Sequence, residues 1–356
     1  MGEARVSNGT ATISVALTTY NGCPFIAPQL DSIATQSRRP DEVVIGDDQS
    51  SDATPLIVQR FASERGIPTH WQRNATRLGC VRNFEQVVRR CRGDIVVFAD
   101  HDDVWAPQRL ARIEAALRQQ PDALGVFSNG LFIDERGQPL PGTLFEKCAF
   151  DAARHARFGA GGALSELVKR NVVTGATLAV RRAALLPLLP FDSFWPHDYY
   201  IALNLAVLGR LLVIDEPLIY YRRHSRQHIG FPAKTWQGVL QIARGQGVAA
   251  CRQEATAFEH LSRRLVALGV DAKSPALEVL RRKGRLLAQR AEMRAHRSRA
   301  PALMWRGLRE GAYRDLSIGW KQLVIDLVAL GAGDGSSRTV RFGPFKSSIL
   351  GPRSGR

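Results

Sequence analysis

Short apolar runs alternate with stretches of helical periodicity through the first 130 residues. The runs Thr12–Leu17, Glu42–Ile45 and Asp94–Ala99 are rich in apolar and β-branched residues, which predicts buried strands. His70–Gln72 predicts a further strand. Between and after these runs, apolar residues recur every three or four positions, over residues 25–36, 56–61, 81–88 and 107–119. The alternation predicts an α/β fold with a mostly parallel central sheet and helices on both faces.

Polar side chains follow three of these predicted strands directly. Thr18–Tyr20 follow the first strand, Asp47 and Asp48 the second, and Asp100–Asp103 the third. In open α/β sheets the ligand crevice lies outside the carboxyl ends of the strands. The sequence therefore predicts that these three clusters surround one site.

The rest of the chain divides by pattern and composition. Extended segments are predicted at 125–133, 172–180 and 211–214, loops with short helices at 134–171, and a buried helix at 198–208. Beyond about residue 235 the pattern is helical and rich in arginine. The predicted organisation is an α/β domain over residues 1–230, a basic, mainly helical extension over 231–330, and a loosely ordered tail over 331–356.

The charge of the chain is concentrated in its last third. The net charge is +16, yet residues 1–230 hold 26 basic and 24 acidic residues, so about +14 belongs to residues 231–356. Polybasic helical segments are attracted to anionic lipid, and Leu303–Arg309 and Trp320–Leu330 mix apolar with basic residues as interfacial helices do. An anionic membrane surface is the predicted partner. A solvated helical appendage and a dimer contact are the alternatives.

Composition also indicates a cellular compartment. The five cysteines form no C-x-x-C pair, which favours a reducing environment over a disulfide framework. Met1–Thr10 lacks the pattern of a signal peptide, and there is no uninterrupted apolar run long enough for a membrane span. We therefore expect a cytoplasmic protein, peripheral on the cytoplasmic face of the inner membrane.

Asp100-His101-Asp102-Asp103 is the densest chemical signal. Three carboxylates in four residues repel one another, so at the end of a buried strand they need a compensating cation. Hard divalent ions take oxygen ligands, and Mg²⁺ commonly shares its shell with substrate phosphates. The alternative is a solvated acidic turn that caps the next helix. The strand context and the second cluster at Asp47-Asp48 favour a Mg²⁺ or Mn²⁺ site.

The ordered set ISVALTTYNG, EVVIGDDQSSDAT and DIVVFADHDDVWAPQRL resembles the inverting family 2 glycosyltransferases of the GT-A fold, most closely the bacterial rhamnosyltransferase-like members. The resemblance continues in Trp195-Pro196-His197-Asp198 and in IDEPLIYYRRHSRQHIG, and it covers roughly residues 12–230. It implies a metal-dependent transfer of a sugar from dTDP-L-rhamnose or a UDP-hexose. The implied acceptor is a hydroxyl of a growing surface glycan, including one linked to a lipid diphosphate.

The resemblance also implies roles for individual residues. Tyr20 would pack against the nucleotide base, Asp48 would accept a hydrogen bond from the uracil or thymine N3–H, and Asp100 would contact the ribose or a metal-bound water. His101 is a departure, since many members have a small residue or glutamine there. The implied nucleotide-sugar contacts are Thr18, Tyr20, Asp48, Arg77, Asn83, Asp100 and Asp103, with Asp102 as metal ligand.

Asp198 is the predicted catalytic base, because an inverting transfer needs a carboxylate that removes the proton from the attacking hydroxyl. The same residue is also a candidate helix N-cap, and the two roles are compatible. His224 is a candidate metal ligand or a solvated histidine of an Arg-rich loop, and Arg222 and Arg223 are candidate phosphate contacts by charge. Trp195 is a candidate platform for an acceptor sugar or a core residue.

Two other functional classes compete with this interpretation. A nucleotidyltransferase that makes nucleotide sugars would use a similar sheet and paired aspartates, but residues 1–25 lack the Gly-rich basic loop such enzymes carry. A nucleic-acid-binding protein would account for the basic extension. No nucleic-acid-binding module is evident, and the basic residues are not interleaved with stacking aromatics, so no nucleic acid partner is expected.

Overall fold

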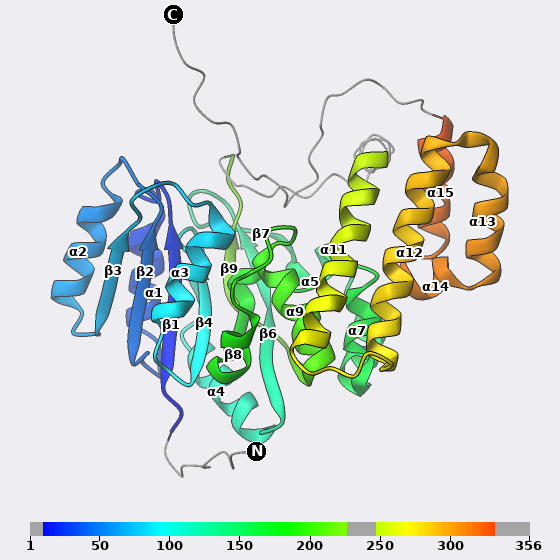
Figure 1. Ribbon diagram of the computed structural model, residues 1–356. Coiled ribbons are helices and arrows are strands. Elements are labelled where there is room, and N and C mark those ends of the chain that lie inside the picture. The colour runs from blue at the N-terminus through cyan, green and yellow to red at the C-terminus, as the bar shows by residue number, and fades with distance from the viewer. Residues whose placement is uncertain (1–9, 226–246, 332–356) are drawn as a thin grey trace, which may run out of the picture. The chain divides into compact units, whose positions relative to one another are not determined.

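The computed structural model describes residues 10–225 and 247–331 (Figure 1). The first part of the predicted extension, residues 231–246, and residues 332–356 of the predicted tail lie outside the described residues. Contacts divide the chain into two compact units. Unit 1 comprises residues 1–147, 173–191 and 211–223, and unit 2 comprises residues 148–172, 192–210 and 224–356. The units interleave along the sequence, and the functional division at residues 230 and 330 stays a prediction.

Among the described residues, nine strands form one sheet in the order β3-β2-β1-β4-β8-β6-β9-β5, with β7 paired to β6. The first four strands in this order are parallel to one another, as the sequence predicts. β8 is antiparallel to β4, β6 to β8, and β5 to β9, so the sheet as a whole is mixed. The strands are β1 (Ile13–Thr19), β2 (Glu42–Asp47), β3 (Thr69–Arg73), β4 (Ile95–Asp100), β5 (Val104–Trp105), β6 (Ala123–Ile133), β7 (Pro139–Thr143), β8 (Leu178–Arg181) and β9 (Arg210–Arg222).

Helices cover both faces of the parallel strands. Ile13, Val15 and Leu17 share one face of β1, because successive side chains alternate, and they belong to a buried cluster with residues of α1, α2 and α4. On the opposite face, the ring of Phe98 from β4 packs against Phe84 of α3, with 5.4 Å between ring centroids. The helices of unit 1 are α1 (Ile26–Ala34), α2 (Thr54–Glu64), α3 (Cys80–Arg90), α4 (Arg109–Gln119), α5 (Leu144–Lys147) and α8 (Arg182–Leu185).

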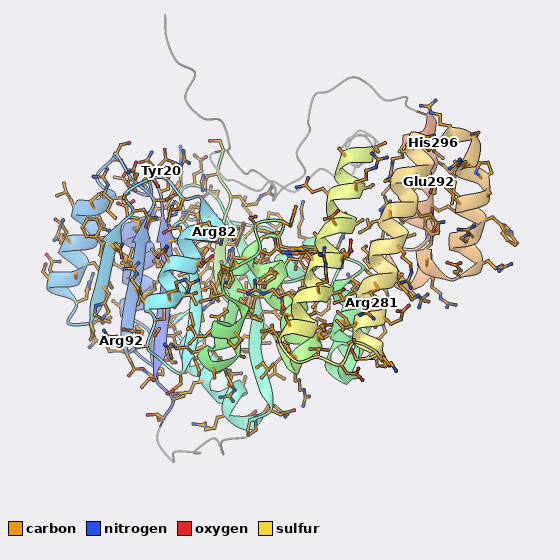
Figure 2. All side chains as sticks on the ribbon, viewed as in Figure 1. Tyr20, Arg82, Arg92, Arg281, Glu292 and His296 are labelled. Atoms are coloured by element: carbon orange, nitrogen blue, oxygen red, sulfur yellow. The ribbon has the colours of Figure 1, made fainter. Side chains whose placement is uncertain are left out.

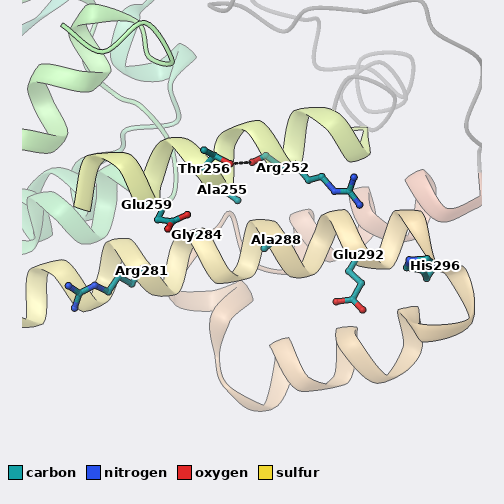
Figure 3. A pocket seen from close by; sticks show the side chains of 9 residues that line it. All are labelled: Arg252, Ala255, Thr256, Glu259, Arg281, Gly284, Ala288, Glu292 and His296. Carbon is teal, nitrogen blue, oxygen red and sulfur yellow. Dashed lines mark hydrogen bonds between the residues drawn. The ribbon is translucent and has the colours of Figure 1, made fainter. Parts of the chain in front are cut away.

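Unit 2 is helical in its described residues. Its longest helices, α11 and α12, lie side by side along most of their length (Figure 1). A groove of about 670 Å³ follows their contact, with Ala255, Gly284 and Ala288 on its floor and residues of both charges along its rims (Figure 3). The helices are α6 (Ala152–Arg157), α7 (Ala163–Leu167), α9 (His197–Leu208), α11 (Val248–Ala267), α12 (Pro275–Ala295), α13 (Ala300–Arg309), α14 (Ala312–Leu316) and α15 (Trp320–Gly331).

The differences from the predicted elements lie where the chain leaves the parallel strands. The strand expected at 172–180 begins only at Leu178, after a 3-10 turn over Gly175–Thr177. The strand expected at 211–214 extends through Arg222. Pairing with β5 accompanies its last residues, and such long-range pairing leaves no periodic signal in the sequence.

Candidate functional site

The ends of three parallel strands form the floor of the candidate site. Thr18 of β1 lies opposite Asp100 of β4 and Gly46 of β2, and Thr19 lies opposite Asp47. The three polar clusters therefore meet at one edge of the sheet, as the strand-end rule predicts. Figure 2 shows Tyr20 at this edge, while Arg92, which precedes β4, lies at the other.

Asp48 organises the loop that follows β3. Its carboxylate accepts hydrogen bonds from Asn74 Nδ2 at 3.0 Å and from the backbone N–H groups of Leu78 and Gly79 at 2.6 and 2.8 Å. An ionised carboxylate offers about four acceptor positions, so three of them are occupied within the protein. Asp48 therefore fastens the loop through its side chain.

Asn83 lies beneath this loop and is buried. Its Nδ2 donates to the carbonyl of Gly46 at 2.9 Å, and its Oδ1 accepts from Asn74 Nδ2 at 3.0 Å. A Cβ on Gly46 would lie 2.4 Å from Asn83 Oδ1, so only glycine fits at that position. The buried side chain of Asn83 therefore links β2 to the loop that follows β3.

Arg77 brings a cation onto the face of Tyr20. The Cζ atom of its guanidinium lies 3.7 Å from the centroid of the ring, a cation–π contact. Arg77 is exposed and Tyr20 is half-buried. Tyr20 and Arg77, which the resemblance places near the nucleotide, are therefore in direct contact. Asp48 fastens the loop that carries Arg77.

Asp103 points into the protein and is fully buried. Its Oδ1 accepts the backbone N–H of Arg222 at 3.0 Å, while its Oδ2 has no hydrogen-bond partner among the described residues. Burial raises the pKa of Asp103 well above its ordinary value, and the charges of Asp102 and Asp100 add to this rise. The three carboxylates are thus close enough to repel one another, as the sequence predicts.

Two buried arginines support the acidic loop. Arg222 donates from Nε to the carbonyl of Asp102 at 2.8 Å and from Nη1 to the carbonyls of Asp134 and Glu135 at 2.9 and 3.2 Å. Arg109 is fully buried with its Cζ 4.4 Å from the Trp105 ring centroid. Burial lowers the pKa of Arg109 to about 9, and the charge of Asp103 opposes that fall.

The structure does not support Arg222 as the phosphate contact that its charge suggests. It is buried and its guanidinium is engaged by carbonyl groups, so it is a structural tie and not an exposed phosphate contact. Arg223, the next residue, is exposed and lies with its Cζ 5.7 Å from the Phe132 ring centroid.

Asp100 and Asp102 are half-buried, and their carboxylate oxygens are the type of ligand that a hard divalent cation takes. No cluster of three or more potential metal-binding side chains occurs among the described residues. Mg²⁺ commonly takes one or two carboxylates and completes its shell with substrate phosphates and water. Burial is the main cause of the raised pKa of Asp103, and the charges of Asp102 and Asp100 add to it; a cation would relieve the second effect.

His101 separates these two aspartates and packs against the neighbouring strand end. A Cβ on Gly22 would lie 2.6 Å from His101 Cδ2 and 2.7 Å from Thr19 Oγ1. The imidazole ring thus rests on the Gly22 backbone. The side chain that departs from the resembled pattern has a packing role, and the spacing of Asp100 and Asp102 is unaffected.

Asp198 and Trp195 belong to unit 2. Asp198 is the second residue of α9 and accepts the N–H of Tyr199 at 2.6 Å, whereas Pro196 occupies the N-cap position, so the capping hypothesis is wrong. Trp195 is buried, with ring centroids 4.8 Å from Phe258 and 5.2 Å from Tyr199. It is a core residue and not a platform for a sugar.

Two histidines, His197 and His224, bear on the predicted base and metal ligand. Burial lowers the pKa of His197, which precedes Asp198, to about 3, so its ring is neutral at physiological pH. His224 is half-buried, follows β9 and belongs to unit 2. Its role as a metal ligand stays a prediction, as does that of Asp198 as a base.

Residues 14–186 match the model of the family described as glycosyl transferase family 2. The chain carries a family 2 glycosyltransferase domain. The match includes all the nucleotide-sugar contacts and the metal ligand Asp102 that the sequence predicts at the strand ends. Asp198, Arg222 and His224 lie beyond it.

Two curated relatives are similar to the chain, and one of them is named as a glycosyltransferase. The chain is 27% identical over 245 residues to an uncharacterised protein of Mycobacterium tuberculosis, covering 67% of this chain and 66% of that protein. It is 28% identical over 228 residues to an uncharacterised glycosyltransferase of Nostoc sp., covering 60% and 65%. The matches span just under two thirds of the length of these relatives.

The fold agrees with that of a solved mannosyltransferase. The mannosyltransferase of Pyrobaculum calidifontis, determined with GDP-mannose and Mn²⁺, superposes with a TM-score of 0.50 at 21% sequence identity, covering 92% of this chain and 88% of that one. The family 2 domain described here therefore has the GT-A fold, with a helical C-terminal extension.

The sequence alone missed several residues of the site. Asn74 follows β3, the fourth parallel strand, and the strand-end rule applied to that strand would have found it. The sequence places Asp47 with Asp48 at the site, but Asp47 is fully buried and its Oδ1 accepts the Ser50 N–H at 2.8 Å. Its role is therefore to hold the turn after β2. Arg109 gave no signal, because a basic residue in an amphipathic helix is ordinarily at the surface.

Proposed function

We propose that this protein is an inverting, metal-dependent glycosyltransferase. It moves a sugar from a nucleoside-diphosphate-sugar, dTDP-L-rhamnose or a UDP-hexose, to a hydroxyl of a growing glycan in bacterial surface polysaccharide synthesis. The observation that carries the proposal is the meeting of Asp100, Asp102, Asp48 and the Tyr20–Arg77 pair at one edge of a family 2 domain.

The chain's residues divide the work of donor binding. Tyr20 and Arg77 present an aromatic face and a cation to the base, and the free acceptor position of Asp48 receives its N3–H. Asp102, with Asp100 beside it, holds Mg²⁺ or Mn²⁺ together with the donor diphosphate. When bound, the ion supplies positive charge to the diphosphate that leaves.

Asp198 removes the proton of the acceptor hydroxyl as its oxygen attacks the anomeric carbon. The new C–O bond forms as the bond to the diphosphate breaks, so the configuration at the anomeric carbon inverts. No covalent intermediate with the protein forms. Burial lowers the pKa of the neighbouring His197, so that ring is neutral at physiological pH and adds no positive charge beside Asp198.

The acceptor is a glycan linked to a lipid diphosphate, and the protein works as a peripheral protein on the cytoplasmic face of the inner membrane. The strongly basic extension supports this location, because both the lipid surface and such an acceptor are anionic. Of the described helices, none is long and apolar enough to cross a bilayer.

A thermal-shift screen of nucleotide sugars with and without Mn²⁺ tests the donor and the metal. A ligand that binds only the folded protein raises its melting temperature. We expect stabilisation by a dTDP- or UDP-sugar that requires metal and is lost in Asp102→Asn. Asp122→Asn, an exposed residue in the turn before β6, is the control and should respond like the wild type.

The outcome also separates the competing classes. Stabilisation by a nucleoside triphosphate and not by any nucleotide sugar would favour a nucleotidyltransferase, and stabilisation by nucleic acid alone would favour a binding protein. For an active donor, the anomeric configuration of the product, read by NMR, tests inversion. A retained configuration, or full turnover in Asp198→Asn, would remove the proposed mechanism.

A further inference from the structure

Helix α15 buries two polar side chains and exposes two large apolar ones. Asp326 and Gln322 are buried, at 1% and 5% exposure, as is Ile325, while Trp320 and Leu327 are 71% and 54% exposed. A helix on the surface of a globular protein ordinarily turns its large apolar side chains inward, as α15 does with Ile325 but not with Trp320 and Leu327. The outer face of α15 therefore exposes apolar surface that its own unit does not cover.

A buried ionic network fixes this orientation. Asp326 accepts from Arg290 Nε and Nη2 at 3.0 and 2.9 Å, from Arg294 Nη2 at 2.8 Å and from the Tyr313 hydroxyl at 3.1 Å. Rotating α15 to bury Trp320 would withdraw Asp326 and leave two arginines of α12 buried without their carboxylate. Breaking such a network is strongly unfavourable, so the apolar face stays outward.

Helix α13 also exposes two large apolar side chains. Ala300, Met304 and Gly307 are buried, and a Cβ on Gly307 would lie 2.9 Å from the Tyr313 ring. Trp305 and Leu308, in contrast, are 61% and 50% exposed. The internal contact of α13 therefore leaves these two side chains uncovered by their own unit.

The exposed apolar residues are concentrated and accompanied by positive charge. Of the eight large hydrophobic residues that are exposed in the described part of the chain, four lie between residues 305 and 327. Residues 297–331 contain six basic and three acidic residues, and one of the acidic residues is the buried Asp326. Exposed apolar clusters mark interaction surfaces, and tryptophan with arginine and lysine is typical of a surface that meets lipid head groups.

We propose that the outer faces of α13 and α15, defined by Trp305, Leu308, Trp320 and Leu327, dock onto an anionic membrane surface. Twelve residues of helix extend about 18 Å, too short to cross a bilayer, so α15 lies along the interface. The inference names the contact surface for the membrane location in the proposed function and rests on it only for its biological setting.

Vesicle flotation tests the proposal. The full chain is mixed with vesicles of phosphatidylcholine alone or of phosphatidylcholine with phosphatidylglycerol. We expect flotation only with the anionic vesicles, weakened by added salt. Trp320→Gln/Leu327→Gln should bind at least about tenfold more weakly, because it removes apolar contact area. Leu56→Gln, which changes a residue of α2 that is 68% exposed, should bind like the wild type.

The changed residues are exposed, so the double variant should melt like the wild type. Trp305→Gln/Leu308→Gln on α13 is the second variant should the first not fold, and it too should bind about tenfold more weakly. Unchanged flotation of the folded variants would overturn the proposal. So would a wild-type dimer that Trp320→Gln/Leu327→Gln converts to a monomer in lipid-free sedimentation equilibrium, because the face would then join two copies.

The donor screen separates this proposal from the proposed function. Because flotation has no activity readout, a chain that floats but is stabilised by no nucleotide sugar retains the membrane surface and loses the transferase assignment. A chain that binds a donor but does not float retains the transferase assignment and loses the membrane surface. Flotation that appears only after removal of residues 332–356 would show that the tail covers the face, which would also overturn the proposal.

Discussion

Arg222→Met is the most informative single change for the candidate site. The side chain of Arg222 makes three hydrogen bonds to carbonyls of Asp102, Asp134 and Glu135, which are far from it in sequence. Methionine keeps much of the apolar volume but donates none of these bonds. The backbone N–H of residue 222 still reaches Asp103, so the change isolates the guanidinium.

The expected loss of stability follows from the number of bonds. A hydrogen bond from a charged donor contributes about 1.5–3 kcal/mol, and carbonyls near the surface regain part of this from water. We therefore expect the free energy of unfolding to fall by about 3 kcal/mol. Because Asp102 loses the group that fixes its backbone, we also expect about a 10- to 100-fold rise in the Mn²⁺ concentration needed for nucleotide-dependent stabilisation.

Urea denaturation measures the first effect, and Mn²⁺ titration of the nucleotide-sugar thermal shift measures the second. Arg223→Met is the matched control, since Arg223 is the next residue along the chain and is exposed. It should change the free energy of unfolding by no more than about 0.5 kcal/mol. Arg222→Lys should lie between, because an ammonium reaches fewer of the three carbonyls.

Two results would refute the reasoning. If Arg222→Met and Arg223→Met are equally stable, the three hydrogen bonds do not hold the loop. If Arg222→Met is destabilised but its Mn²⁺ response is unchanged, Arg222 has a structural role without a positioning role for Asp102.

Three further predictions follow from single residues. Asp103→Ala should lower the free energy of unfolding by about 3 kcal/mol, because it removes the acceptor for Arg222 N–H and the charge beside buried Arg109. Asp102→Ala should change the free energy of unfolding little but lose the metal response. Equal urea midpoints for the two variants would contradict this prediction. Gly46→Ala should destabilise by at least about 2 kcal/mol, measured in urea, because its Cβ would lie 2.4 Å from Asn83 Oδ1; a wild-type midpoint would show that Asn83 moves aside freely. Burial lowers the pKa of Lys283 to about 8. Between about pH 8 and the ordinary lysine value the unfolded chain binds the proton that the folded chain has released, so stability should rise with pH in that window, and Lys283→Met should remove the rise.

The parallel half of the sheet could be predicted because its strands carry a local signal. The strands ending at Thr19, Asp47 and Asp100 are almost entirely buried and contain short apolar, β-branched runs, and each is followed at once by polar residues. Since parallel strands end at the same edge, local patterns were sufficient to bring Thr18, Asp48 and Asp100 together. The same rule applied to β3 would have added Asn74.

The supporting residues could not be predicted, because they depend on antiparallel pairing between distant segments. Val104 lies opposite Tyr220, which places Arg222 beside the acidic loop, and no periodicity in either segment records that pairing. Burial of Arg109 was equally hidden, because its charge predicts a solvated position on α4. Charge alone therefore suggested phosphate binding for an arginine whose guanidinium is engaged inside the protein.

The three aspartates of the acidic loop thus have different environments despite their adjacency. Asp103 is fully buried and is held by the Arg222 backbone beside the Arg109 guanidinium, so its side chain has no surface left for a ligand. Asp100 and Asp102 stay half-buried at the sheet edge. The inward residue fixes the loop, and the repulsion that it adds would raise the benefit of a cation at the other two. If Asp100 and Asp102 hold the metal as proposed, their placement depends on the third aspartate and on an arginine about 120 residues further along the chain.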